Sequence, residues 1–336
     1  MGTADAIAFG MRDLRRTLAT IVLSAPMVGC VTPLSGHSQT CPDIDKGETD
    51  DTFAIDHDDA TLATVVAKCE QQNDCHDLCD ALYVMKYGLN NAVFDTCELV
   101  STGGEHLHVV AHLECVGGRR PGNYRRGIGD VTCNAVGRFL ADQADLEAAS
   151  VRAFADVYAD LVELGAPADI RRAVIRAAAD EVRHAHVCAR LARRYGATAV
   201  LRRSSPAPRR SLHAFAIDNA IEGCVRETFG AAVAGYQARS AGDPIVRRAM
   251  YRIARDEAKH AALAWRIQRW LLRRLGADDR RTMLAASTAA RTELSTTMLV
   301  RDPTLVQTLG LPAPAAATAM LAELDTRVWS PLAWRA

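Results

Sequence analysis

An internal repeat in the second half of the chain constrains the fold more than any other feature of the sequence. Residues 180–185 read DEVRHA, and residues 256–261, 76 positions later, read DEAKHA. The segments before them also correspond, with IRRAV at 170–174 and VRRAM at 246–250. This period is too long for a solenoid unit. The sequence therefore predicts two copies of a helical hairpin that pack together as a four-helix bundle.

Glycine stops and a proline-containing turn divide this region into four helices. Gly165, Gly196 and Gly276 follow three of the helical patterns, as glycine commonly does at a helix C-terminus. A Gly-Asp-Pro turn separates the last two helices. The expected helices span residues 136–164, 168–195, 211–239 and 245–275, and the expected bundle covers residues 136–276.

Acidic and histidine side chains recur at matching positions on these helices. Glu181 and His184 are three residues apart, as are Glu257 and His260, so each pair lies on one helix face. Two further acids lie in the middle of the first and third helices and share a face with phenylalanines seven positions later. Six side chains are therefore expected to point into the core as metal ligands: Glu147, Glu181, His184, Glu222, Glu257 and His260.

Burying this group of side chains requires compensating positive charge, because four ionised carboxylates in a core are otherwise prohibitively costly. Two divalent cations supply that charge, and carboxylates with imidazoles suit iron or manganese. Glu227 is an alternative to Glu222, from which it lies about 140° round a regular helix. Its counterpart in the first copy is Arg152, so Glu222 is preferred. His186 lies off the face of His184 and is expected on the surface.

This constellation resembles the ferritin-like superfamily of di-iron carboxylate proteins, in which two helices each supply a Glu and two others each supply Glu-x-x-His. The resemblance covers residues 136–276. It implies a centre of two iron ions, with manganese as the other option, and an oxygen-dependent oxidase or hydroxylase. Residues 180–184 also look like the Asp-Glu-x-Arg-His motif of soluble di-iron oxygenases, whose Asp hydrogen-bonds the far nitrogen of a ligand His. That implies supporting roles for Asp180 and Asp256, although Lys259 replaces the Arg in the second copy.

Two other classes of function are compatible with the sequence. One is iron oxidation or iron handling without a storage cage, and the other is a non-catalytic surface lipoprotein that uses the bundle as a scaffold. An oxygenase needs electrons, and the sequence carries no flavin or iron–sulfur motif, so a partner protein is expected to donate them. No sequence feature names an organic substrate. The 40 basic and 40 acidic residues cancel, which argues against a nucleic-acid partner.

The N-terminus has the features of an export signal. Three arginines precede an uncharged run that ends in small residues just before Cys30. A cysteine at this point resembles a bacterial lipobox, which implies cleavage before Cys30 and lipidation of its thiol. Met27 stands where Leu is usual, and an ordinary secretory signal cut nearby is the alternative. We expect residues 1–29 to be a lipoprotein signal peptide, and the exported protein to be held on a bacterial membrane by a lipid anchor, in the periplasm or at the cell surface.

Clustered cysteines after an export signal imply disulfides in an oxidising compartment. Cys75 and Cys79 are one helical turn apart and are not expected to bond each other, and the connectivity otherwise stays open. A zinc site is the alternative, although no paired C-x-x-C spacing supports it. Cys188 and Cys224, in helical sequence, are expected to remain reduced in the core. The disulfide candidates are Cys69, Cys75, Cys79, Cys97, Cys115 and Cys133.

The remaining boundaries follow from composition and periodicity. Residues 30–58 are polar and are expected to form a flexible tether. A small cysteine-rich domain is expected over 59–135, and within it residues 105–115 alternate in polarity as a strand does. The histidines at 106, 108 and 112 share the polar face of that strand. Residues 277–336 are expected to be a C-terminal helical extension. The predicted protein is thus mainly α, with the bundle preceded by a disulfide domain.

Overall fold

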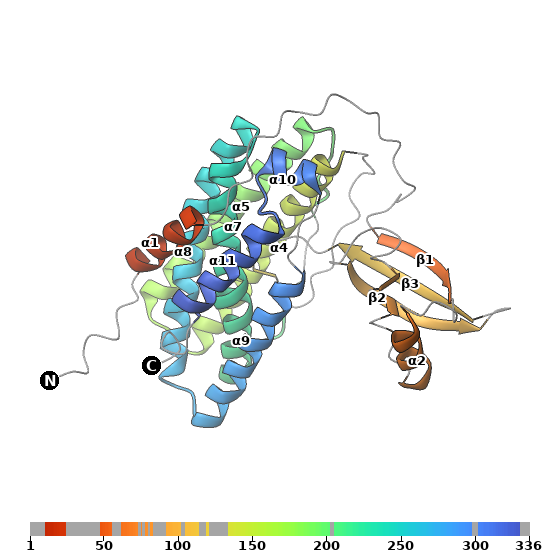
Figure 1. The fold of residues 1–336 in the computed structure, drawn as a ribbon. Helices are drawn as coiled ribbons and strands as arrows, with labels where there is room; N and C mark the ends of the chain where they lie inside the picture. The colour runs from red at the N-terminus through yellow and green to blue at the C-terminus, as the bar shows by residue number, and fades with distance from the viewer. Residues whose placement is uncertain are drawn as a thin grey trace. The chain divides into compact units, whose positions relative to one another are not determined.

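The computed structural model describes residues 11–24, 48–55, 62–72, 75, 78–79, 81–82, 92–101, 105–113, 119–120, 134–201, 205–297 and 302–329. The chain is mainly helical and divides into two compact units, one that carries a small sheet and one built from helices. Figure 1 shows both units. Each is described by itself.

The helical unit contains the expected hairpins. The first pairs α4 (Ala135–Glu163) with α5 (Ala168–Arg194), and the expected break between them is confirmed at Gly165, whose positive φ of 70° suits a glycine. In the second, α8 (Pro244–Leu272) packs against a continuous helical stretch. That stretch consists of α6 (Leu212–Asp218), η1 (Asn219–Glu227) and α7 (Thr228–Ser240).

The two hairpins meet where α5 packs on α8 (Figure 1). Polar caps satisfy free backbone N–H groups at the starts of α4, α6 and α8, whereas α5 begins after Pro167 without a side-chain cap. Asn134 accepts a hydrogen bond from the N–H of Gly137, and Ser211 accepts one from that of Ala214. Asp243 accepts from the N–H groups of Ile245 and Val246. The repeat therefore folds as two helical hairpins whose α5 and α8 run together through the core.

The middle of the second hairpin is not a regular α-helix. The nine residues of η1 form a π-helix, whose backbone hydrogen bonds join residues five apart. Trp329 is buried beside it, and its indole N–H donates to the carbonyl of Cys224 at 2.8 Å. Because a π-helix has more residues per turn than an α-helix, side-chain directions within η1 depart from the 3.6-residue period.

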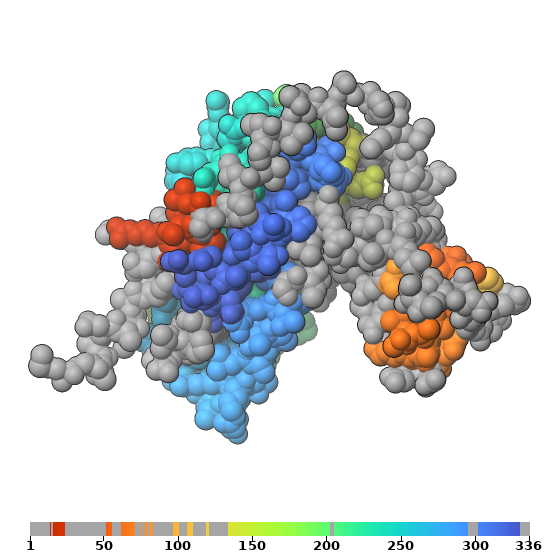
Figure 2. Space-filling view, viewed as in Figure 1, coloured from red at the N-terminus to blue at the C-terminus, as the bar shows by residue number. Residues whose placement is uncertain are grey.

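Further helices cover the bundle. These are α9 (Ala277–Thr297), α10 (Pro303–Leu309) and α11 (Pro314–Arg327), in the region expected to be a helical extension. The segment expected to be a signal peptide contains α1 (Met11–Ser24), which contacts α7, α8 and α11. Figure 2 shows α1 beside α11 on one face of this unit. No single helix among the described residues is long and apolar enough to span a membrane; α10 and α11, bent by 64°, reach that length and apolarity only as a pair.

The other unit is an antiparallel sheet with a helix. Its strands are β1 (Glu48–Ala54), β2 (Ala92–Ser101) and β3 (Glu105–Leu113), in the order β1-β3-β2, and its helix is α2 (Ala63–Gln72). The strand expected near residues 105–115 is confirmed: Leu107 and Val109 are buried and His108 is half-buried. His112 lies on β3 opposite Glu48.

The tether expectation was wrong for residues 48–54, because this polar stretch forms β1 and pairs with β3. The polar composition of this stretch did not predict a strand. It nevertheless contains Phe53, which packs against the core of the sheet unit. β1 is an edge strand of the sheet, a position where a polar sequence is tolerated.

Within the described part of this unit, two disulfides join Cys69 to Cys75 and Cys79 to Cys97. These four cysteines are therefore not zinc ligands, and Cys75 and Cys79 do not bond each other, as expected. The other disulfide candidates, Cys115 and Cys133, lie outside the described residues, as does Cys30. The expectation that Cys188 and Cys224 stay reduced and buried is confirmed. The two disulfides indicate that the protein folds in an oxidising environment.

Candidate metal centre

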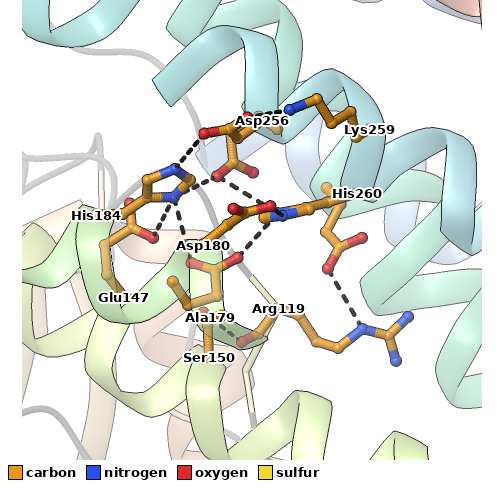
Figure 3. Close-up of polar contacts among 12 residues, drawn as sticks. Arg119, Glu147, Ser150, Ala179, Asp180, His184, Asp256, Lys259 and His260 are labelled. Atoms are coloured by element: carbon orange, nitrogen blue, oxygen red, sulfur yellow. Dashed lines mark hydrogen bonds and ion pairs between the residues drawn. The ribbon is translucent and has the colours of Figure 1, made fainter. Parts of the chain in front are cut away.

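Five of the six expected ligand side chains meet in the core of the helical unit. Glu147 comes from α4, Glu181 and His184 from α5, and Glu257 and His260 from α8, and all five are buried. Figure 3 shows His184 between Glu147 and Asp256, with Asp180 beside His260. Four of the side chains form a group in which one ligand atom from each lies within 4.8 Å of all the others, a spacing that could hold a metal ion: Glu147, Glu181, His184 and Glu257.

The two imidazoles face this centre with the same nitrogen. Nδ1 of His184 lies 3.0 Å from Oε1 of Glu257 and 3.6 Å from Oε2 of Glu181. It is also 3.7 Å from Oε2 of Glu147. Nδ1 of His260 lies 3.0 Å from Oε1 of Glu181 and 3.7 Å from Oε1 of Glu257. Glu181 and Glu257 therefore lie between the two histidines.

The opposite nitrogen of each imidazole faces an aspartate from the other copy of the repeat. Nε2 of His184 is 3.6 Å from Oδ2 of Asp256, and Nε2 of His260 is 3.3 Å from Oδ2 of Asp180. Each aspartate is in turn paired with a basic residue three positions later, Arg183 or Lys259. The structure thus brings Asp180 and Asp256 to the far nitrogens of the two histidines.

Several buried atoms of this cluster have no hydrogen-bond partner, even though opposite charges lie within ion-pair distance. Buried polar atoms in native proteins nearly always find a partner, so a group of such atoms pointing at one another calls for an explanation. Carboxylate oxygens and imidazole nitrogens that converge in this way fit divalent iron or manganese. The atoms without a partner include Glu147 Oε2, Glu181 Oε2, His184 Nδ1, Glu257 Oε1 and His260 Nδ1.

Burial and neighbouring charges shift the pKa values of the clustered side chains in different directions. Burial and the neighbouring Glu181 raise the pKa of Glu147 well above its usual value, which favours its protonated form. Burial alone would lower the pKa of His184 and His260, but the facing carboxylates outweigh it and raise both, so both imidazoles are charged. Burial opposes ionisation of Glu181 and Glu257, yet the two histidines lower the pKa of each. Two cationic imidazoles thus face two carboxylates.

Glu222, the sixth expected ligand, does not join the cluster. Its side chain is 16% exposed, and its Oε2 lies 3.9 Å from Nε of Arg120 and accepts from the N–H of Arg120 at 3.3 Å. Its Oε1 lies 3.4 Å from Nε of Arg226. The expectation was wrong because it extended the 3.6-residue period of an α-helix through a segment that is a π-helix.

Glu227, the alternative on the same segment, is the acid of η1 that is buried next to the cluster. Its side chain is 2% exposed, and its Oε2 has no hydrogen-bond partner. Burial raises the pKa of Glu227 to about 7, and the charges that act on it include those of Arg119, His260 and Glu257. The sequence indicated Glu227 as the alternative to Glu222. Only the π-helical geometry of η1 shows that Glu227 is the acid buried in the core.

Arg119 is a residue of this site that the sequence did not indicate. It lies outside the repeat, yet its side chain is only 2% exposed and reaches η1. Its Nε lies 3.4 Å from Oε1 of Glu227, and its Nη2 donates to Oδ1 of Asn219 at 2.8 Å. Its Nη1 donates to Oδ2 of Asp218 at 3.2 Å. A guanidinium in the core is unusual, and this one is matched to the acids of a single helical segment.

No protein-family model, curated protein or solved structure matches the chain. The chemistry of the site is therefore inferred from its own donor set. Buried carboxylates with two imidazoles are hard and borderline donors, which distinguishes them from the thiolate sets that select zinc or iron–sulfur clusters.

Proposed function

We propose that the helical unit is a ferritin-like bundle that holds two iron ions, or two manganese ions, and supports oxygen-dependent redox chemistry. The observation that carries the proposal is the buried cluster of carboxylates and imidazoles whose inward-facing atoms lack hydrogen-bond partners. Glu227 replaces Glu222 in the ligand set because it is the buried acid of η1. The proposed ligands are Glu147, Glu181, His184, Glu227, Glu257 and His260.

Charge supports a pair of ions in place of a single one. The four carboxylates of the proposed set carry four negative charges when ionised, and two divalent cations compensate them. Without such ions, the raised pKa values of Glu147 and of both histidines favour protons in their place. Metal binding would replace these protons, as it does wherever ligands must lose a proton to coordinate.

The aspartates prepare the histidines for this role. Asp180 accepts a hydrogen bond from Nε2 of His260, and the carboxylate of Asp256 lies 3.6 Å from Nε2 of His184; both contacts favour the tautomer that carries its proton on Nε2. Nδ1 of each ring then presents its lone pair to the centre. Ions bound here would supply reducing equivalents to oxygen or peroxide. The protein's part is to exclude bulk water, hold the rings and keep a carboxylate environment at fixed geometry.

Metal content tests the proposal directly. We expect the full chain, reconstituted with ferrous iron or Mn²⁺ without oxygen, to retain close to two ions per chain by elemental analysis. His184→Ala and His260→Ala are expected to reduce that content sharply. His186→Ala is the matched control, because His186 is on the same helix and exposed. If the wild-type chain retains neither metal, the bundle is a scaffold without a metal centre. If His186→Ala is as damaging as His184→Ala, the ligand assignment fails.

Oxygen consumption separates the two redox functions. A ferroxidase would consume oxygen with ferrous iron alone, whereas an oxidase or hydroxylase would need an electron donor and a substrate. We propose the second, with electrons delivered by a partner protein, since the sequence carries no electron-transfer motif of its own. Oxygen uptake proportional to added ferrous iron, and unaffected by electron donors, would contradict this choice.

We also propose that the protein is exported and lipidated at Cys30. The two disulfides of the sheet unit support the export part, because such bonds persist in oxidising compartments. The lipobox-like sequence supports lipidation. Removal of residues 1–29 would take α1 away from α7 and α11.

A further inference from the structure

We infer that Arg119 is an internal cation that pairs with Glu227 until a metal ion displaces it, so that the two metal positions fill one after the other with unequal affinity. The inference rests on the proposed metal centre and deepens it. It assigns a task to a buried residue outside the repeat, and it follows from the contacts of the guanidinium.

The guanidinium has three partners, and Glu227 is the one it holds least closely. The distance to Asn219 is 2.8 Å, that to Asp218 is 3.2 Å, and that to Glu227 is 3.4 Å. Glu227 can therefore turn toward a metal ion while Arg119 keeps its other two partners. The second oxygen of Glu227, Oε2, is buried and has no hydrogen-bond partner, so it is already available.

The surroundings of Arg119 are built to hold it. Gly223 leaves the space that the guanidinium occupies, since a Cβ there would lie 2.3 Å from Nη2. The carbonyl of Arg119 accepts a hydrogen bond from Ser150 at 2.8 Å, a contact shown in Figure 3. Asn219 is itself fixed, because its amide donates to Oε1 of Gln268 at 2.7 Å. Arg119 therefore stays in place when one of its contacts is lost.

The two metal positions consequently differ. Among the described residues, the ion pairs of Glu147, Glu181 and Glu257 are with the two histidines, so no arginine competes with an ion that enters there. An ion that takes Glu227 as a ligand would compete with Arg119 for this carboxylate and would remain near a fixed positive charge. Repulsion between like charges in a buried site is strong, so the second ion binds more weakly.

Titration of the full chain with Mn²⁺, at constant pH and without oxygen, tests the inference. Wild type is expected to bind Mn²⁺ in two steps that differ by about tenfold or more. Arg119→Gln should bring the second step closer to the first and leave the first unchanged. Arg120→Gln is the matched control, because Arg120 pairs with Glu222 outside the cluster, and it should behave as wild type.

A second pair of variants identifies the ligand. Glu227→Gln should abolish the second step, whereas Glu222→Gln, the same change on the same helical segment, should leave both steps intact. If Arg119→Gln does not fold, the wild-type titration still decides, because two equal steps would overturn the inference. Two ions bound identically by wild type and a folded Arg119→Gln protein would also overturn it and leave the metal centre standing. If no variant binds Mn²⁺ or ferrous iron, the metal centre itself fails.

Discussion

His260 contacts Asp180 across the two copies of the repeat, with 3.3 Å between Nε2 and Oδ2. The reciprocal contact, from His184 to Asp256, spans 3.6 Å. Each copy of the hairpin therefore contacts the histidine of the other, and neither copy alone contains all the proposed ligands and their supporting contacts. The duplication is thus required for the site as well as for the packing of the helices.

Replacing one of these aspartates with asparagine should weaken metal binding while the core remains packed. Asp180→Asn and Asp256→Asn each replace a charged acceptor at Nε2 of a ligand histidine, a change that typically costs 10–100-fold in metal affinity. Competition with a chelator for Mn²⁺ measures the loss. Asp278→Asn is the control, because the side chain of Asp278 is 88% exposed and lies on α9. Wild-type affinity in both variants would show that the cross-copy contacts do not support the histidines.

The sequence predicted those parts of the fold and site that depend on a regular period. The period of an α-helix places Glu181 with His184 and Glu257 with His260, and both pairs lie in the buried cluster. The same period failed for Glu222, because η1 is a π-helix that no residue pattern announced. A helix that departs from its usual period changes which acid faces the core.

Two further features depend on contacts between segments far apart in the chain. Arg119 is buried by groups about 100 positions later, such as Asn219, and nothing local indicates this. The polar strand β1 is fixed by its pairing with β3, more than 50 positions later, and only Phe53 contributes a large apolar side chain within it. Contacts with distant residues determine both the burial of Arg119 and the formation of β1. The pattern of a single sequence contains little information about such contacts.

Asp243, the N-cap residue of α8, should make the free energy of unfolding depend on pH. Burial raises the pKa of Asp243, but the Tyr195 hydroxyl and the N–H groups of Ile245 and Val246 donate to its carboxylate and lower the pKa overall. A carboxyl with a lowered pKa in the folded state contributes stability above the unfolded-state pKa of about 3.9, and loses it as the pH falls toward the folded-state value.

Two substitutions at Asp243 separate the charge from the cap. Asp243→Asn should reduce the loss of thermal stability between about pH 5 and pH 2 while keeping the helix capped. Asp243→Ala should cost about 1 kcal/mol of unfolding free energy at pH 7, because the N-cap is lost. Denaturant unfolding at several pH values measures both. The same pH dependence in wild type and Asp243→Asn would mean that other groups control the acid response.

The two disulfides should differ in their contribution to the sheet unit. The Cys79–Cys97 bond closes a loop with a sequence separation of 18, and Cys69–Cys75 one of 6. Loop-closure entropy gives about 3 kcal/mol for the longer loop and about 2 kcal/mol for the shorter. Paired Cys→Ala variants and denaturant unfolding test this order.

Thiol counting supplies an independent measurement on the exported protein. Cys188 and Cys224 should react only after denaturation, since both are free and buried. The four bonded cysteines should not react without a reductant. The chain has 10 cysteines, of which the two bonds use four, so seven or more free thiols in the denatured, unreduced protein would contradict the disulfide assignment.

Lipidation of Cys30 should determine whether the protein is recovered with membranes. We expect Cys30→Ala to move the protein from the membrane fraction to the soluble fraction, and the wild-type mature chain to lack residues 1–29 by mass spectrometry. Cys188→Ala is the control, because its thiol is buried in the helical unit. A Cys30→Ala protein that still fractionates with membranes would rule out the lipid anchor, whereas a wild-type mature chain that retains α1 would rule out cleavage.

Gly223 should be essential to the arrangement around Arg119. A Cβ at this position would lie 2.3 Å from Nη2 of Arg119 and 2.7 Å from Cβ of Ala264, distances at which a neighbour must move. On an unobstructed helix, Gly→Ala would stabilise by up to about 1 kcal/mol. Here we expect Gly223→Ala to destabilise by about 1–3 kcal/mol, as over-packing of a core does.

A glycine without close neighbours provides the control. A Cβ at Gly276 would meet only Oδ2 of Asp279, at 3.9 Å, so Gly276→Ala should leave stability nearly unchanged. Denaturant unfolding of the metal-free protein compares the two variants. Because the added methyl group pushes on the guanidinium, Gly223→Ala should also alter the second step of Mn²⁺ binding, and Gly276→Ala should not. A Gly223→Ala protein with wild-type stability and wild-type Mn²⁺ binding would show that Arg119 does not occupy the space above Gly223.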